Sequence, residues 1–432
     1  MQRVDSFFDR IRFFFLEKSI FFPSALLFFI QRRKFEKLLL YAQKNTFFFK
    51  KLFIGKSLSY ADLEMLPTTT RKDVQNHGAD MTNQKLPQWM YGISKGGTSG
   101  TTGEPIRFYN SSFQTKFNHI QIMYVYFNIY RSIILHGFSV RKLLEKMHFA
   151  EIRTPDALEE KHVYSARNRY FFIDHTNLHV QSREIVEKVF SLQPDVFGCY
   201  ATSTLEFCHY VEEYGYVGKI RIPYIINGGE VLLEGQKAYV EKVLGGKVYN
   251  RYGAAEFGSI AVEQKGVKGY VSLAESFVVE IVDDNNKSVA PGETGRVLVT
   301  DLFNYTQPFI RYELGDLALL HEKKGPYIRF SLQGRNRYVM FGAKKLSHFE
   351  LNSLFAEHAE AIIQYQIVKK SENLIEVHIV KNSLYFEFMS EDIIRHVSSM
   401  LGPDIDVKVC FMDSIARMGR GKTLVYIDET VK

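Results

Sequence analysis

The chain has 432 residues, of which 46% are hydrophobic and 24% charged, and its formal net charge is +7. This length predicts a large domain plus a smaller one, and the composition is typical of a globular protein with a substantial core. The positive charge is too diffuse to indicate nucleic-acid binding, but it is compatible with anionic ligands.

The cysteines Cys199, Cys208 and Cys410 are too few for a disulfide framework, which favours a reducing, cytoplasmic location. Cys208 is followed directly by His209, which is not the spacing of a metal-ligand pair, and no second Cys/His pair completes such a site. We therefore expect the cysteines to be core residues.

Residues 1–60 are expected to form a helical lead-in, because apolar residues recur at helical spacing between Phe35 and Ala42. The mostly apolar segment 19–30 is too short to span a membrane, and Pro23 lies within it. Its basic, phenylalanine-rich surroundings suit peripheral contact with the inner face of a membrane, whereas the alternative is a helical pair packed on the core. We favour the packed pair.

Residues 66–74 predict a turn followed by a threonine-capped helix, and a glycine- and threonine-rich loop follows at 96–105. Glycine lets consecutive backbone N–H groups turn around an anion, and hydroxyls add uncharged donors, so the loop is a candidate polyphosphate site. A flexible surface loop has the same composition. The strand predicted at 106–109 distinguishes the loop from a P-loop, which a helix follows.

Strands and helices then alternate, which predicts α/β layers. The predicted helices are 118–130, 181–192, 203–214 and 236–244. The predicted strands are 170–173, 194–198 and 222–230, the last of which ends in the turn that holds Gly229 and Glu230.

Two further clusters follow strands. Residues 248–256 predict a strand that ends in a small-residue turn and presents Glu256, a position suited to a metal or substrate. After β-like segments within 277–300, residues 309–316 end in Gly315 and Asp316, whose carboxylate suits the hydroxyls of a ribose. Arg335 comes soon after and could reach ribose or phosphate. Each of these pairs, taken alone, is also common in plain turns.

Short strands and helices alternate in the last hundred residues, for example at 361–368, 374–381 and 389–401. A segment of this length is the size of a small domain. Residues 416–423 nearly match the phosphate-loop pattern, but Ala416 replaces its first glycine and a strand is predicted at 424–427 instead of a helix. We therefore reject a P-loop. Lys422 remains as a lysine on a glycine hairpin, with a solvated terminal lysine as the alternative.

The order of these motifs resembles the adenylate-forming ligase superfamily. Over about residues 38–428 the chain is similar to its phenylacetate-CoA ligase branch, which includes relatives from capsular-polysaccharide and coenzyme F390 synthesis. The resemblance is carried by the motifs at 98–105, 252–256, 312–316, 334–335 and 421–422. Residues 41–49 and 66–70 resemble the N-terminal region of that branch.

The resemblance implies an α/β fold: a large multi-sheet adenylation domain, here 1–334, followed by a small mobile α+β lid domain, here 335–432. It also implies that a carboxylic acid attacks ATP to give an acyl-adenylate and pyrophosphate, and that an acceptor then takes the acyl group. Thr101, Glu256 and Lys422 would be catalytic, and Glu256 would hold Mg²⁺. The implied ATP-binding residues are Thr98, Ser99, Gly100, Thr101, Thr102, Gly103, Gly229, Glu230, Tyr252, Gly253, Ala254, Asp316 and Arg335.

The sequence departs from the family pattern at three places. Ile106 stands where many superfamily members have lysine, Asn336 begins a segment without the usual acidic pair, and the segment 340–345 is shorter before its glycine. These departures favour the capsule-type relatives, whose acceptor is an amine or hydroxyl on a sugar. Coenzyme A as acceptor, direct acylation of a sugar or amine, and a noncatalytic nucleotide-binding relative remain as alternatives.

Overall fold

The computed structural model describes residues 22–83, 93–97, 106–111, 147–153, 170–175, 177–264, 266–335, 338–341, 344–402, 404–418 and 422–430. The chain divides into two units. The described parts of Arg141–Asn250 and Arg337–Lys432 form unit one, and those of Val4–Val140 and Arg251–Asn336 form unit two. The boundary between 250 and 251 falls within strand β7, Lys247–Ala254.

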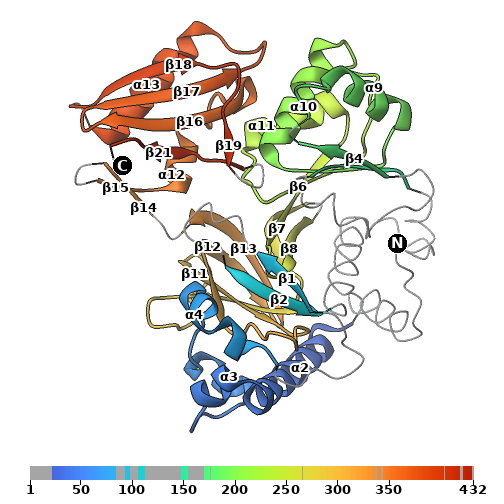
Figure 1. The fold of residues 1–432 in the computed structure, drawn as a ribbon, viewed down its shortest axis with the longest axis vertical. Helices are drawn as coiled ribbons and strands as arrows, with labels where there is room; N and C mark the ends of the chain where they lie inside the picture. The colour runs from blue at the N-terminus through green and yellow to red at the C-terminus, as the bar shows by residue number, and fades with distance from the viewer. Residues whose placement is uncertain are drawn as a thin grey trace. The chain divides into compact units, whose positions relative to one another are not determined.

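Unit two begins with helices, drawn in blue in Figure 1. They are α2 (Ser24–Asn45), α3 (Phe47–Leu52), the 3₁₀ helix η1 (Tyr60–Met65) and α4 (Arg71–Met81). The hydroxyl of Thr46 caps α3 by accepting from the N–H of Phe49. Thr70 and Asp73 form a reciprocal capping box that begins α4, so the predicted threonine-capped helix is confirmed.

Helix α2 packs on the sheet of unit two rather than standing apart from it. Gln31 lies on this helix, and its buried side chain donates hydrogen bonds of 2.9 Å to the carbonyls of Ala274 and Phe277. Leu27, Phe35, Leu38 and Leu39 are also buried. The packed helix is thus confirmed for the described part of the lead-in, and none of the described helices is long and apolar enough to cross a membrane.

The sheet of unit two is antiparallel, in the order β10-β11-β12-β13-β9-β8, and residues 251–254 of β7 pair with β8. Its strands are β8 (Gly258–Gln264), β9 (Val267–Ser272), β10 (Phe277–Val282), β11 (Thr294–Asp301), β12 (Tyr312–Lys324) and β13 (Tyr327–Arg335). A separate antiparallel hairpin joins β1 (Ile93–Gly97) to β2 (Arg107–Ser111).

A buried arginine ties the segment before α4 to this sheet. Arg311 is fully buried, forms a 3.0 Å ion pair with Glu280 and donates to the carbonyl of Leu66. Thr69 donates its N–H to the carbonyl of Arg311 and its hydroxyl to the carbonyl of Ile310. These hydrogen bonds from Thr69 fix the start of α4 next to the start of β12, because Thr69 precedes α4 and Arg311 precedes β12.

Unit one contains a parallel sheet ordered β4-β3-β5-β6, with the first part of β7 next to β6. Its strands are β3 (Phe149–Arg153), β4 (Tyr170–Asp174), β5 (Val196–Cys199) and β6 (Tyr224–Gly228), and its helices are α9 (Ser182–Leu192), α10 (Ala201–Glu213) and α11 (Glu234–Leu244). These elements confirm the predicted alternation to within a few residues. The helix predicted at 118–130 lies outside the described residues.

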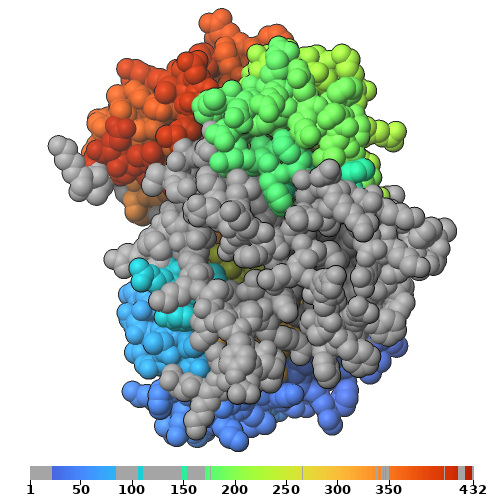
Figure 2. All heavy atoms as spheres, turned by 45° about the vertical axis from the view of Figure 1, so that its right-hand side comes forward, coloured from blue at the N-terminus to red at the C-terminus, as the bar shows by residue number. Residues whose placement is uncertain are grey.

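The C-terminal part of unit one is a four-stranded sheet ordered β18-β17-β16-β21 with α13 packed on one face (Figure 1). Its elements are β14 (Tyr338–Phe341), β15 (Lys344–Ser347), α12 (His348–Ser353), η3 (Ala359–Ala361), β16 (Ile362–Ser371), β17 (Leu374–Lys381), α13 (Glu387–Leu401), β18 (Asp406–Phe411), β19 (Arg417–Met418), β20 (Lys422–Thr423) and β21 (Tyr426–Asp428). The amide of Gln236 in α11 donates to the carbonyl of Ile362, and Figure 2 shows the green and red segments of this unit against one another.

Candidate active site

The glycine- and threonine-rich sequence lies between two paired strands, and the second of them, β2, confirms the strand predicted after the loop. Gly97 at the end of β1 is paired with Arg107 at the start of β2. The hairpin is held in place by Gln307, which accepts from the N–H of Tyr109 at 2.8 Å and donates to the carbonyl of Gly78. The predicted phosphate-binding residues Thr98, Ser99, Gly100, Thr101, Thr102 and Gly103 lie outside the described residues.

Unit two brings together three of the predicted ATP-binding residues from separate strands. The phenol of Tyr252 on β7 donates a 2.7 Å hydrogen bond to Oδ2 of Asp316 on β12. The Nε of Arg335 on β13 lies 3.0 Å from Oδ1 of the same carboxylate. Burial, and then the charge of Asp316, raise the pKa of Tyr252 well above its usual value, so this phenol acts as a donor at neutral pH.

The strand register explains why Asp316 and Arg335 meet. They are paired across β12 and β13, and the register shifts just beyond them between Leu317 and Ala318. Gly315 and Gly334 both have positive φ, 79° and 97°, next to this irregularity. A second bond, from Arg335 to the carbonyl of Leu314, holds the guanidinium at this edge. Carboxylate oxygens have several lone pairs each, so Asp316 keeps acceptor capacity for further hydroxyl donors.

The turn after β7 places Glu256 in a buried position, with 4% of its surface exposed. Gly253 permits this turn, because a Cβ added there would lie 1.9 Å from the carbonyl oxygen of Gly258. Ala254 accepts the N–H of Phe257 across the turn. A glycine at 253 is therefore needed for the tight approach of the two strands, in addition to any role in ligand binding.

Burial raises the pKa of Glu256, while the charges of Arg71 and Arg335 act in the opposite direction. The hydroxyl of Tyr312 lies 3.5 Å from Oε1 of Glu256 and also favours its ionised form. A desolvated carboxylate gains from a nearby divalent cation, so the chemistry of Glu256 fits Mg²⁺. Arg71 and Tyr312 were not among the predicted site residues, although both lie in segments that the sequence motifs include.

Gly229 and Glu230 belong to unit one. Gly229 has a φ of 83°, and the backbone carbonyl of Glu230 accepts from Asn227 at 3.0 Å. The carboxylate of Glu230 accepts the N–H of Thr202, in the first turn of α10. Acidic groups stabilise the positive end of a helix dipole, so Glu230 has a structural role at α10.

Lys422 begins β20, which pairs with β19 so that Met418 lies opposite Lys422. The predicted hairpin is confirmed in its backbone, and β21 follows it as a strand, in agreement with the rejection of a P-loop. Lys422 belongs to unit one, whereas Tyr252, Glu256, Asp316 and Arg335 belong to unit two. The structure thus groups four of the predicted residues within unit two.

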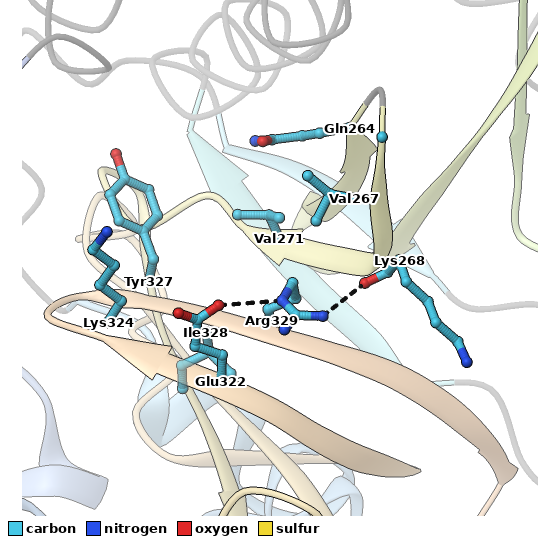
Figure 3. Close-up of a pocket in the computed structure, with 10 residues that line it drawn as sticks. Gln264, Val267, Lys268, Val271, Glu322, Lys324, Tyr327, Ile328 and Arg329 are labelled. Atoms are coloured by element: carbon cyan, nitrogen blue, oxygen red, sulfur yellow. Dashed lines mark hydrogen bonds and ion pairs between the residues drawn. The ribbon is translucent and has the colours of Figure 1, made fainter.

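Each unit also contains a cavity. The cavity in unit two has a volume of about 500 Å³ and is lined by strands β8, β9, β12 and β13, with Arg329 held by Glu322 and by the carbonyl of Lys268 (Figure 3). None of the predicted site residues within the described part of the chain lines it. The cavity in unit one, of about 870 Å³, is lined by polar side chains that include His175, Glu206 and Lys381, and by the segment just before β19.

Comparisons with known proteins agree with this fold. A family model described as the CapK C-terminal domain matches residues 342–429, which include Lys422. A 2-hydroxyisobutyryl-CoA ligase solved in complex with 2-HIB-AMP has a TM-score of 0.70 at 17% identity, covering 92% of this chain and 89% of that one. An anthranilate CoA ligase, AuaEII, solved with anthranoyl-AMP has a TM-score of 0.55 at 14% identity, covering 77% and 66%.

The large mixed sheet, together with these structural matches, defines the fold class: the chain has the fold of the CoA ligases that were solved with acyl-AMP intermediates. Within this class the sequence is similar to Protein CapK of Staphylococcus aureus, with 21% identity over 376 residues, 82% of this chain and 78% of CapK. It is also 25% identical over 228 residues to the human mitochondrial acyl-coenzyme A synthetase ACSM5, covering 46% of this chain and 38% of that protein.

Proposed function

We propose that this protein uses ATP to convert a carboxylic acid to an acyl-adenylate, with release of pyrophosphate, and then transfers the acyl group to an acceptor. The observation that carries the proposal is the Asp316 carboxylate, held by Tyr252 at 2.7 Å and Arg335 at 3.0 Å. An acceptor-only group that is fixed on both oxygens suits recognition of the two ribose hydroxyls of ATP.

The remaining roles follow the order of the motifs along the chain. Backbone N–H groups and hydroxyls from Thr98 to Gly103 would hold the β- and γ-phosphates, and Thr101 would contact the reacting phosphate. Tyr252, Gly253 and Ala254 would form the wall of the adenine and acyl sites. Gly229 and Glu230 are also proposed to bind ATP. Such contacts act mainly by positioning the carboxylate of the acid in line with the α-phosphate.

Glu256 would hold Mg²⁺, which supplies positive charge against the departing pyrophosphate. The protein's own contribution at this point is a buried carboxylate whose ionised form is favoured by Arg71, Arg335 and the hydroxyl of Tyr312. Burial opposes that ionised form by raising the pKa of Glu256, and a bound Mg²⁺ would favour it again.

Lys422 would contact the reacting carboxylate and the α-phosphate, and so offset the charge that develops during adenylation. Its place on a two-stranded hairpin, in the segment that matches the CapK C-terminal domain, supports this role. We propose that residues 335–432 act as a mobile lid that carries Lys422 to the site, with the adenylation domain spanning 1–334.

The acceptor is proposed to be coenzyme A or an amine or hydroxyl of a sugar. The solved 2-hydroxyisobutyryl-CoA ligase complex with 2-HIB-AMP and CoA supports the thioester route. The match to CapK over most of both chains agrees with the capsule-type relatives that the sequence motifs resemble. For such a relative, direct acylation of a sugar is the alternative route that we propose. A cytoplasmic enzyme that touches the membrane through its N-terminal segment would fit a lipid-linked acceptor.

The decisive experiment is a pyrophosphate–ATP exchange assay over a panel of carboxylic acids. We expect exchange that depends on one class of acid, and loss of exchange in Lys422→Ala with ATP binding largely retained. Lys408→Ala, which changes an exposed lysine paired with Asp406, is the matched control and should retain exchange.

ATP binding without exchange for any acid would instead favour a noncatalytic nucleotide-binding protein. Unchanged exchange in Lys422→Ala would overturn the role of that lysine. Once an acid is found, product analysis with coenzyme A and with amino sugars as competing acceptors distinguishes the thioester route from direct acylation.

A further inference from the structure

The C-terminal sheet contains a cluster of metal-ligating side chains that the proposed ligase reaction does not use. Glu376 and His378 are two residues apart on β17 and therefore point to the same face of the sheet. Cys410 on β18 is paired directly with His378 in the parallel register. Among the described residues, one ligand atom from each of these three side chains lies within 4.8 Å of the other two.

This face of the sheet is the one that faces away from α13. The alternating residues Ile375, Val377 and Ile379 belong to the core cluster that includes α13, and so does Val407 on β18. Glu376, His378 and Cys410 are partly exposed, so an ion can reach them from solvent. Cys199 and Cys208 are buried as expected, whereas Cys410 differs from that expectation because it lies on the outer face of an edge strand.

We propose that Glu376, His378 and Cys410 form a Zn²⁺ site with its fourth position open to water. A thiolate, an imidazole and a carboxylate are the ligand set that suits zinc, whereas Mg²⁺ and Ca²⁺ prefer oxygen ligands throughout. Nε2 of His378 already lies 2.9 Å from Oε2 of Glu376. Ligand atoms around tetrahedral zinc are about 3.5 Å apart, so only side-chain movements of about 1 Å are needed to admit the ion.

The charges nearby are compatible with the site. One thiolate and one carboxylate balance the charge of Zn²⁺. The ammonium of Lys370 lies 4.0 Å from Glu376, but it also forms a shorter 2.6 Å contact with Glu429. Lys408 pairs with Asp406 at 3.8 Å. Each lysine therefore has another carboxylate partner, and Lys370 is expected to weaken zinc binding without preventing it.

The site would join β17 to β18, which is an edge strand of its sheet. A metal that binds only the folded state stabilises that state by mass action. Here the metal would stabilise the pairing of β18, an edge strand with a neighbouring strand on one side only. This role is independent of acid activation, and its test needs no ligase substrate.

The test uses the full-length reduced protein, first freed of metal with a chelator. Zn²⁺ is titrated while the alkylation rate of Cys410 is followed by peptide mass spectrometry, and Co²⁺ is titrated as a spectroscopic probe. We expect saturating Zn²⁺ to slow alkylation at least tenfold, and Co²⁺ to give a thiolate-to-cobalt charge-transfer band. Mg²⁺ at the same concentration should do neither. Wild type should also melt at a higher temperature with Zn²⁺.

Variants decide whether these three residues are the ligands. Cys410→Ser should abolish the charge-transfer band and the zinc-dependent rise in melting temperature, and Glu376→Gln and His378→Gln should weaken binding at least tenfold. His396→Gln is the matched control, because His396 pairs with Glu357 at 3.8 Å elsewhere in the same domain. Lys370→Met should tighten zinc binding. Alkylation of Cys410 unaffected by Zn²⁺, or equal Zn²⁺ affinity in Cys410→Ser and wild type, would overturn the proposal.

Discussion

Tyr252 and Asp316 lie 64 positions apart in the sequence and are joined by a 2.7 Å hydrogen bond between buried side chains. The bond connects the strand that ends next to Glu256 with the strand that carries the proposed ribose-binding carboxylate. It therefore couples the positions of two parts of the candidate site, and it offers the most direct way to perturb one without changing a charge.

Tyr252→Phe should weaken ATP binding and leave the fold intact. The variant removes one donor from Asp316 while Arg335 still holds the other oxygen. A hydrogen bond to a charged group contributes about 1.5–3 kcal/mol, so we expect the KM for ATP to rise about tenfold or more in pyrophosphate exchange. Tyr327→Phe is the matched control, since Tyr327 donates to Glu275 at 3.1 Å and is not a predicted site residue. Equal effects of the two substitutions would contradict a specific role for Tyr252.

Glu256→Gln should raise the Mg²⁺ concentration needed for exchange by at least tenfold, because the amide keeps the shape but loses the charge that would hold the cation. Tyr312→Phe should have a much smaller effect, about threefold or less, since its hydroxyl lies 3.5 Å from Glu256 and forms only a weak hydrogen bond. Mg²⁺ titrations of the exchange rate measure both. A larger effect from Tyr312→Phe than from Glu256→Gln would reverse the assignment.

Gly253→Ala should destabilise unit two, because the added Cβ would meet the backbone oxygen of Gly258 at 1.9 Å and backbone cannot rotate away. We expect the free energy of unfolding in urea to fall by about 2 kcal/mol or more. Gly78→Ala is the control: its Cβ would have no neighbour closer than 3.6 Å, and its effect should stay within about 1 kcal/mol. A neutral Gly253→Ala would mean that the turn can open.

Stability should depend on pH through Asp301. Burial raises the pKa of this carboxyl to about 7, although the N–H groups of Phe303 and Asn304 partly offset the effect. The folded protein then binds the proton more tightly than the unfolded chain, so the stabilisation is complete below the ordinary carboxyl pKa near 4. It is lost as the pH rises to about 7, by on the order of 4 kcal/mol.

Asp301→Asn removes this ionisation. Urea unfolding at about pH 4.5 and about pH 7.5, which span most of the transition between about 4 and 7, should therefore show a smaller pH-dependent difference in the variant than in wild type. A difference of the same size in both proteins would show that other groups cause the pH dependence.

Much of the local structure was predictable from the sequence. The short element predicted at 374–381 coincides with strand β17, and the helix predicted at 181–192 begins one residue later as α9. The sequence predicts a threonine cap within 66–74, which Thr70 provides, and it predicts the strand at 106–109, which overlaps β2 of the hairpin. These features depend on side-chain alternation, helical periodicity and capping, which neighbouring residues determine among themselves.

The order of the motifs along the chain likewise pointed to the resemblance with adenylate-forming ligases. Motif order can be compared without knowing where the residues lie in space, so it also identified candidate site residues. The sequence therefore predicted the fold class, the local elements and the site candidates Tyr252, Glu256, Asp316 and Arg335. It could not predict that Tyr252 and Arg335 share one carboxylate, that Tyr312 and Arg71 favour the ionised form of Glu256, or that Cys410 lies opposite His378. The physical reason is that these contacts depend on strand register and bulges between segments distant in the chain, and a shift of one residue would turn every side chain to the other face.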